Sequence, residues 1–134
     1  MGLLGASLER VVPGEVELAL PFRADLAQQH GFLHAGIVTA VVDSACGYAA
    51  LSLMEAGAAV LSVEFKVQLL APARGAWFRA IGRVVRAGRT LTVVTGELRA
   101  FAEAPSGGAA QDGEVVALLN GTMMAVRDRP GLTD

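Results

Sequence analysis

A lone carboxylate lies in the middle of an apolar stretch of this sequence. Asp43 is the only charged residue among the twenty from Ala35 to Met54. Because burial of an unpaired charge is costly, a carboxylate in such a stretch usually has a function. It can take a proton from water as a general base, or attack an electrophilic carbon as a nucleophile. The sequence leaves both roles open for Asp43.

The beginning of the same stretch can stabilise negative charge. If Ala35 and Gly36 form the first turn of a helix, their backbone N–H groups lack partners within it and lie at the positive end of its dipole. Such a turn can hold a carbonyl oxygen as it becomes an oxyanion, which acyl transfer requires. His34, directly before the turn, can fix it through a side-chain hydrogen bond or help to hold the carbonyl.

One helix cannot bring these groups together. Asp43 follows Ala35 by eight positions. That is about 12 Å along a helix axis, whereas both groups must come within about 3 Å of one reacting centre. Antiparallel copies of the helix across a two-fold axis would bring Asp43 of one subunit to Ala35 of the other. The spacing therefore predicts a homodimer with two equivalent sites at its interface.

The helix that positions these residues is expected to span residues 35–54 and to be almost wholly buried. Helical spacing puts Asp43 on a side of small residues, which leaves room for a close backbone or for a ligand. Cys46 has no evident base partner and is expected to be a packed side chain, not a nucleophile. Several polar residues and two glycines within the segment argue against a membrane span.

Alternating polar and apolar residues predict strands on both sides of the helix. The expected strands are residues 15–20 before it and 61–70, 76–86, 90–101 and 114–126 after it. Short turns with Gly or Pro separate most of them, and residues 103–114 are expected to form a longer hairpin loop. This order indicates an α+β fold in which a helix of about 30 Å covers one face of an antiparallel sheet.

The composition fits a single domain, residues 1–134, that associates with copies of itself, since a hydrophobic content of 53% is high for this length. A net charge of -2 without a basic run argues against nucleic-acid binding. One cysteine and the absence of a signal-peptide pattern favour the cytoplasm. Two histidines and one cysteine without ligand spacing argue against a metal site, and no nucleotide-binding fingerprint is found.

The spacing around His34 resembles a known family. Gln28-x-x-Gly31-x-x-His34-Ala35-Gly36, followed by Asp43, is similar to the PaaI-type hotdog-fold thioesterases, which carry Asn or Gln, then Gly, then His-Gly-Gly. Residues 62–73 and 121–124 resemble the strand after the central helix and the last strand of that family. The resemblance extends from about residue 14 to residue 127. One departure is that Ala35 replaces the first glycine of the pair, which an alanine can do where φ is negative.

The resemblance implies a hotdog fold, a curved antiparallel sheet of about five to six strands around one long central helix. It also implies hydrolysis of acyl-CoA thioesters, with Asp43 as base or nucleophile and the N–H groups of Ala35 and Gly36 as oxyanion donors. Gln28 and His34 would orient the substrate, and the hydroxyl of Ser62 would lie near the site.

The same resemblance suggests the substrate and the assembly. Family members often form tetramers as pairs of dimers, and their substrates suggest an aryl-acyl group, while a medium-chain acyl group remains open. The phosphates of coenzyme A need cations, for which Arg83, Arg86 and Arg89 are candidates. Coenzyme A would be part of the substrate, and no other cofactor is expected.

Two other functions remain open on the sequence. A hotdog dehydratase acting on 3-hydroxyacyl thioesters would need a histidine and an acid in facing positions, and the His-x-Gly turn makes it less favoured. A non-catalytic module that binds acyl thioesters would use Asp43 only as a structural carboxylate, bonded to a neighbouring hydroxyl or amide.

Overall fold

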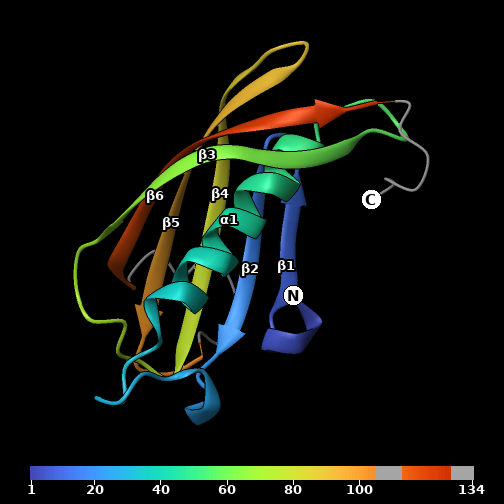
Figure 1. The fold of residues 1–134 in the computed structure, drawn as a ribbon. Helices are drawn as coiled ribbons and strands as arrows, with labels where there is room; N and C mark the ends of the chain where they lie inside the picture. The colour runs from blue at the N-terminus through green and yellow to red at the C-terminus, as the bar shows by residue number, and fades with distance from the viewer. Residues whose placement is uncertain (105–112, 128–134) are drawn as a thin grey trace.

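The computed structural model describes residues 1–104 and 113–127. In these residues the chain forms one α-helix and a six-stranded antiparallel sheet with the strand order β1-β2-β4-β5-β6-β3 (Figure 1). The elements are η1 Gly2–Leu4, β1 Ser7–Val12, β2 Glu15–Pro21, η2 Ala24–Leu26, α1 Ala35–Leu51, β3 Ala59–Leu69, β4 Trp77–Ala87, β5 Leu91–Phe101 and β6 Glu114–Val126. The predicted α+β class, with a curved antiparallel sheet around one long helix, is confirmed. Residues 105–112 of the predicted loop lie outside the described part.

One strand, β1, was not predicted from the sequence. β1 pairs antiparallel with β2 through the turn at Pro13 and Gly14, where Gly14 has a φ of 79°. Two adjacent charged residues, Glu9 and Arg10, interrupt its apolar pattern, and the register shifts between Leu8 and Arg10. Such a bulge breaks the period-2 alternation that marks a strand in a sequence. The helix also ends at Leu51, three residues before its predicted end.

The helix lies in the hollow of the curved sheet and packs closely against its centre (Figure 1). Gly82 of β4 and Gly96 of β5 are direct cross-strand partners beneath it. A Cβ atom at Gly82 would lie 2.3 Å from the backbone carbon of Ala45, and one at Gly96 would lie 2.6 Å from Sγ of Cys46. The absence of side chains at this pair therefore lets the helix backbone approach the sheet.

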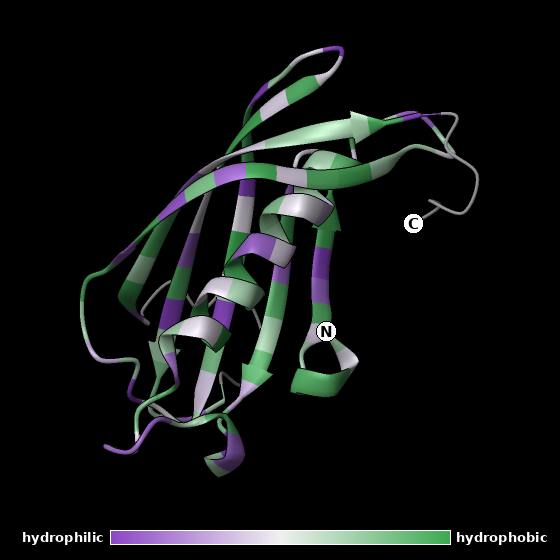
Figure 2. Ribbon diagram, in the orientation of Figure 1, coloured by the Kyte–Doolittle hydropathy of each residue, from purple (hydrophilic) through white to green (hydrophobic). Residues whose placement is uncertain are grey.

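The hydrophobic core lies between the helix and the inner face of the sheet, the face toward α1. The buried helical residues are Val38, Val41, Val42, Ala45, Cys46, Ala49 and Ala50. Along the strands, apolar and polar residues alternate, which Figure 2 shows as green and purple bands. The outer face carries ion pairs that join neighbouring strands, among them Arg83 with Glu15 and Glu97. Within the described residues, no helix is long and apolar enough to cross a membrane.

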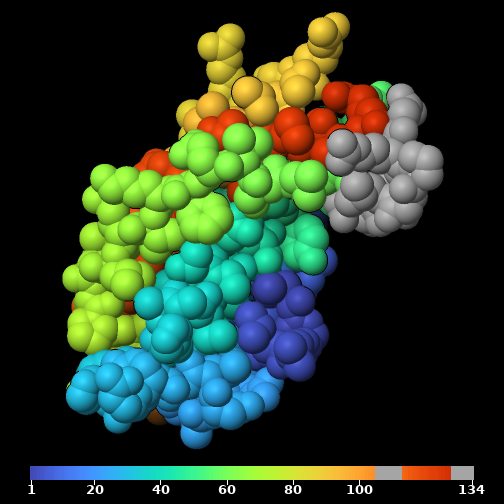
Figure 3. Space-filling view, viewed as in Figure 1, coloured from blue at the N-terminus to red at the C-terminus, as the bar shows by residue number. Residues whose placement is uncertain are grey.

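β3 forms one edge of the sheet. Within the described chain it pairs only with β6, so its other edge has no strand partner. Four of its apolar side chains are exposed, namely Leu61, Val63, Phe65 and Leu69. An open edge with exposed apolar residues is a surface that proteins usually pair or cover. In Figure 3, β3 borders the exposed side of the helix, which lies between β3 and the N-terminal segment.

Candidate active site

His34 caps the helix. It has extended backbone angles, φ -63° and ψ 138°, and its Nδ1 accepts a hydrogen bond of 2.9 Å from the N–H of Gly36. A Cβ atom at Gly36 would lie 3.1 Å from this nitrogen, so the glycine leaves room for the imidazole. The histidine therefore fixes the turn through its side chain, the first of the two uses that its position predicted.

The N–H of Ala35 remains as the donor that this turn presents to a ligand. Ala35 is the exposed first residue of α1, and no hydrogen bond of its N–H is found among the described residues. The first N–H groups of a helix have no partner within it and point outward at its positive end. The helical conformation suits alanine, so the replacement of the family's glycine strains nothing. Of the two expected oxyanion donors, the N–H of Gly36 instead donates to His34.

Gln28 lies beside Ala35. Both line a cavity of about 480 Å³, here called the helix N-terminal pocket, together with Phe32, Leu69 and Pro72. The Oε1 of Gln28 accepts a hydrogen bond from the backbone N–H of His30. Hydrogen bonds of Gln28 N–H to Phe32 O and of Gly31 N–H to Gln28 O hold this loop. The side-chain NH₂ of Gln28 is therefore the group that could donate a hydrogen bond to a substrate carbonyl or to a water molecule.

Asp43 is half-buried and holds a hydrogen bond with β3. The Oγ of Ser62 donates to its Oδ1 at 2.7 Å. Both residues line a second cavity of about 200 Å³, here called the carboxylate pocket, with Ser44, Gly47, Tyr48, Val60 and Met123. The Oγ–Oδ1 bond leaves Oδ2 of Asp43 to act on a water molecule or a carbonyl carbon.

A β-bulge in β3 turns the side chain of Ser62 toward Asp43. Strict alternation along β3 would place Ser62 on the same face as Glu64. The register to β6 shifts between these two residues, so Ser62 pairs with the core residue Met123, whereas Glu64 pairs with Thr122. The extra residue turns Ser62 to the helix side of the sheet. Alternation alone would have pointed this hydroxyl outward.

Cys46 is fully buried and is unsuited to nucleophilic attack. Burial raises the pKa of its thiol to about 12, and the negative charge of Asp43 adds to this effect. Because the thiolate is the reactive form, the thiol is inert near neutral pH. Asp43 therefore remains the candidate base or nucleophile of the carboxylate pocket.

The residues predicted from the sequence fall into two separate groups. Gln28 and Ala35 line the helix N-terminal pocket, and Asp43 and Ser62 line the carboxylate pocket; no lining residue is common to both. Asp43 follows Ala35 by eight residues of regular helix, which is about 12 Å along the axis. The helix therefore carries two groups of candidate residues, here called half-sites, which lie too far apart on one chain to act on one carbonyl.

The three predicted arginines lie away from both pockets. Arg83 is held on the outer face by Glu15 and Glu97. Arg86 pairs with Val93 in the sheet register, and Arg89 lines a different cavity at the far end of the helix. Sequence reasoning missed Arg74, whose guanidinium lies 5.2 Å from the centre of the Phe32 ring in the helix N-terminal pocket.

Sequence reasoning also missed Tyr48. This helical residue lines the carboxylate pocket together with Asp43. It follows Ser44 by one turn, which is the signal that could have found it.

Sequence comparison places these features in a family. The sequence model of the thioesterase superfamily matches residues 30–103. This range holds the helix-capping turn and both residues of the Ser62–Asp43 hydrogen bond. The chain belongs to the thioesterase superfamily.

Two solved structures of this superfamily share the fold. A thioesterase family protein from Silicibacter pomeroyi is 52% identical, with a TM-score of 0.85 over 96% of this chain and 89% of that one. The E. coli PaaI protein, from the phenylacetic acid degradation operon, is 22% identical, with a TM-score of 0.78 over 98% of this chain and 84% of that one. The resemblance to the hotdog-fold thioesterases is therefore confirmed.

A curated relative from Halobacterium salinarum carries a provisional name as an esterase. It is 34% identical over 69% of this chain, and the match covers 64% of that protein. The chain thus spans a little under two thirds of this relative's length.

Proposed function

We propose that this protein hydrolyses the thioester bond of an acyl-CoA to a free acid and coenzyme A. The observation that carries the proposal is the pair of half-sites on one helix, an outward N–H at Ala35 and a carboxylate at Asp43. Membership of the thioesterase superfamily supports thioester hydrolysis. Coenzyme A as the thiol, and an aryl-acyl or medium-chain acyl group, are the finer parts of the proposal.

The proposed reaction uses groups of the chain alone. The carboxylate of Asp43 takes a proton from water as the water oxygen attacks the thioester carbon, and the N–H of Ala35 in the partner subunit stabilises the oxyanion. Collapse of the tetrahedral intermediate breaks the C–S bond, and the thiolate takes the proton back from Asp43. In the nucleophilic variant, Asp43 forms a mixed anhydride that water then hydrolyses. Neither route needs a metal ion or a further cofactor.

The proposed site forms across a homodimer. The free edge of β3 and its exposed apolar side chains offer a surface for a second copy. Ser62, which holds Asp43, is itself on β3, so an interface at this strand would lie directly beside the carboxylate pocket. A two-fold axis makes such a contact self-complementary and creates two equivalent sites. A homotetramer of two such dimers and a cytoplasmic location complete the proposal.

Cations for the phosphates of coenzyme A are proposed near the helix N-terminal pocket and on the β4–β5 turn. Arg74 lies over Phe32, which lines that pocket. No ion pair is found for Arg86 or Arg89 in the described residues, whereas Arg83 is already paired with two carboxylates. We therefore favour Arg74, Arg86 and Arg89 over Arg83 as phosphate ligands.

Thiol release from a panel of acyl-CoAs tests the function. The wild type is expected to release coenzyme A, and Asp43→Asn is expected to reduce kcat/KM by a factor of about 100, equivalent to about 2.7 kcal/mol of barrier. Glu64→Gln, on the outward face of β3, is the matched control because it removes a carboxylate from the neighbouring strand. Equal rates in wild type and Asp43→Asn would remove Asp43 from the mechanism.

The Ser62–Asp43 hydrogen bond also favours a second function. A carboxylate satisfied by a neighbouring hydroxyl is what a non-catalytic acyl-thioester binding module would have. Such a module would bind an acyl-CoA in a calorimetric titration without release of thiol, and the Asp43→Asn variant would bind equally well.

A further inference from the structure

The inner face of the sheet is incompletely covered at β1. Leu8 and Val11 pair with Leu18 and Val16 of β2, so all four side chains point toward the helix side. The two β2 residues are 2% and 1% exposed, whereas Leu8 and Val11 are 59% and 52% exposed. The helix therefore covers β2 and leaves β1 open.

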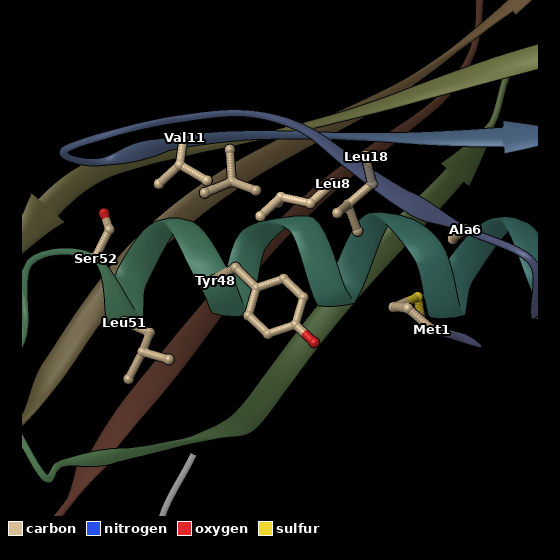
Figure 4. A pocket seen from close by; sticks show the side chains of 9 residues that line it. Met1, Ala6, Leu8, Val11, Leu18, Tyr48, Leu51 and Ser52 are labelled. Carbon is tan, nitrogen blue, oxygen red and sulfur yellow. The ribbon is translucent and has the colours of Figure 1, made fainter. Parts of the chain in front are cut away.

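This gap forms a cavity of about 430 Å³, here called the N-terminal cavity. Figure 4 shows Leu8, Val11 and Leu18 pointing down toward α1, with Met1 at one end and Leu51 and Ser52 at the other. Its volume lies within the range of about 300–1,000 Å³ that is usual for small-molecule sites.

The chemistry of the lining suits a hydrocarbon. Its two polar side chains are those of Tyr48 and Ser52. The Oγ of Ser52 already donates to Ala49 O at 2.7 Å and accepts from Gly14 N–H at 2.8 Å. A ligand rich in amides, such as the pantetheine arm of coenzyme A, would lose hydrogen bonds to water there without replacing them. An aliphatic or aromatic group would lose none.

The cavity and the carboxylate pocket share a lining residue. Tyr48 lines both of them, with Asp43 and Ser62 on one side and Leu8 and Val11 on the other. Its half-exposed ring projects from the helix beside the N-terminal cavity (Figure 4). The side chain of Tyr48 is therefore the point at which a chain attached to a carbonyl carbon at Asp43 would enter the cavity.

We infer that the N-terminal cavity binds the hydrocarbon part of the acyl group and thereby sets which acyl-CoAs this protein accepts. The inference rests on the proposed thioester hydrolysis. It makes β1 and the residues before it a specificity element, and it assigns the thiol side of the substrate to the helix N-terminal pocket. Loss of a single methylene contact in an apolar pocket changes kcat/KM by roughly tenfold or more.

An activity ratio tests the inference. In Leu8→Trp the indole fills the cavity, so the ratio of kcat/KM for octanoyl-CoA to that for acetyl-CoA is expected to fall at least tenfold. The matched control is Leu3→Trp, the same exchange in the same segment at a side chain that is 90% exposed and does not line the cavity. It should leave the ratio at the wild-type value. An unchanged ratio in Leu8→Trp, with circular dichroism of the wild-type form, would overturn the inference.

A binding experiment separates this inference from the proposed function. Sodium octanoate is titrated into protein with labelled Leu and Val methyl groups, followed by NMR. Shifts at Leu8, Val11 and Leu51 are expected. Shifts confined to Leu69 and Leu70 would place the chain in the helix N-terminal pocket and overturn the inference, as would no shifts at all. Octanoate shifts in the N-terminal cavity without hydrolysis of any acyl-CoA would instead refute the proposed function.

Discussion

At the scale of single residues, two hydrogen bonds orient the candidate site, and each leaves one further group available to a substrate. His34 holds Gly36 and thereby leaves Ala35 as the outward N–H; Ser62 holds one oxygen of Asp43 and leaves the other. Orientation of these groups before a substrate arrives would avoid their reorganisation during the proposed reaction. The two predictions at this scale concern variants that remove the N–H of Ala35 and the helix cap of His34.

Ala35→Pro removes only the proposed oxyanion donor. Proline is tolerated at the first position of a helix, and the extended angles of His34, φ -63° and ψ 138°, already suit a residue that precedes proline. We expect kcat for the best acyl-CoA to fall by a factor of about 100 to 1,000, with the fold intact by circular dichroism. A variant as active as the wild type would exclude the Ala35 N–H from the reaction.

His34→Ala is expected to lower the free energy of unfolding by about 1 kcal/mol because the helix loses its cap. His34→Asn retains a side-chain acceptor and should keep most of that stability. The matched control is His30→Ala, an exposed histidine four residues earlier, which should change stability by less than about 0.5 kcal/mol. Urea unfolding measures all three. If His34→Ala were as stable as His30→Ala, the cap would contribute nothing.

At the scale of elements, the helix and the sheet meet where glycines face each other across β4 and β5. The Gly82–Gly96 pair allows the close approach that seats α1 in the sheet. On the outer face of the sheet, charged residues join β1, β2 and β4: Glu15 accepts hydrogen bonds from Arg10 and Arg83. One prediction belongs to each face.

Gly82→Ala should destabilise the protein by about 1–3 kcal/mol, since its Cβ would overlap the helix backbone at Ala45, which cannot rotate away. Gly2→Ala is the control, because a Cβ at Gly2 would meet nothing within 4 Å. Thermal unfolding of the two variants measures the difference. Equal melting temperatures would show that the helix can shift from the sheet at little cost.

Glu15→Gln tests the ion pairs of the outer face through pH. Burial alone would raise the pKa of Glu15, but the hydrogen bonds of Arg10 and Arg83 outweigh it and hold the pKa below its ordinary value of 4.5. The stabilisation is therefore complete above pH 4.5 and is lost as pH falls through the lower folded-state pKa. At pH 7 we expect the variant to be less stable by no more than about 1 kcal/mol, because the pairs are exposed. Urea unfolding should show this deficit shrinking under acid conditions; a deficit independent of pH would contradict the assignment.

At the scale of the whole molecule, the proposed function needs a second copy of the chain, because its two half-sites lie apart on one helix. The helix N-terminal pocket and the carboxylate pocket have no lining residue in common, and about 12 Å of helix separates their reactive groups. β3 offers both the open edge and the serine that holds Asp43. Activity and association are therefore expected to be inseparable.

Mixing two inactive variants tests the shared site. A heterodimer of Asp43→Asn and Ala35→Pro has one site with both groups intact if the site spans two subunits, and none if it lies within one. After subunit exchange at equal concentrations we expect about a quarter of the wild-type kcat per subunit, since half of the dimers are mixed and each has one good site of two. No recovery, with mixed dimers demonstrated by native mass spectrometry, would contradict the cross-subunit site.

The sequence by itself determined the α+β class, the long helix and the strands β2 to β6, and it pointed to the residues of the candidate site. Period-2 alternation and one long apolar helix were enough for the α+β class, because burial of one face imposes these periods locally. The cluster from Gln28 to Asp43 was recognisable because its spacing is set within one turn and one helix.

Contacts between distant segments were decided only by the tertiary structure. The bulge in β3 turned Ser62 toward Asp43, against the alternation of its own strand. β1 was missed because its bulge interrupts the alternation of polar and apolar residues. The N-terminal cavity, which β1 lines together with Tyr48, exists because the helix does not cover that edge of the sheet. Strand register and side-chain packing depend on contacts between residues that are far apart in the sequence, and local sequence patterns do not predict these contacts.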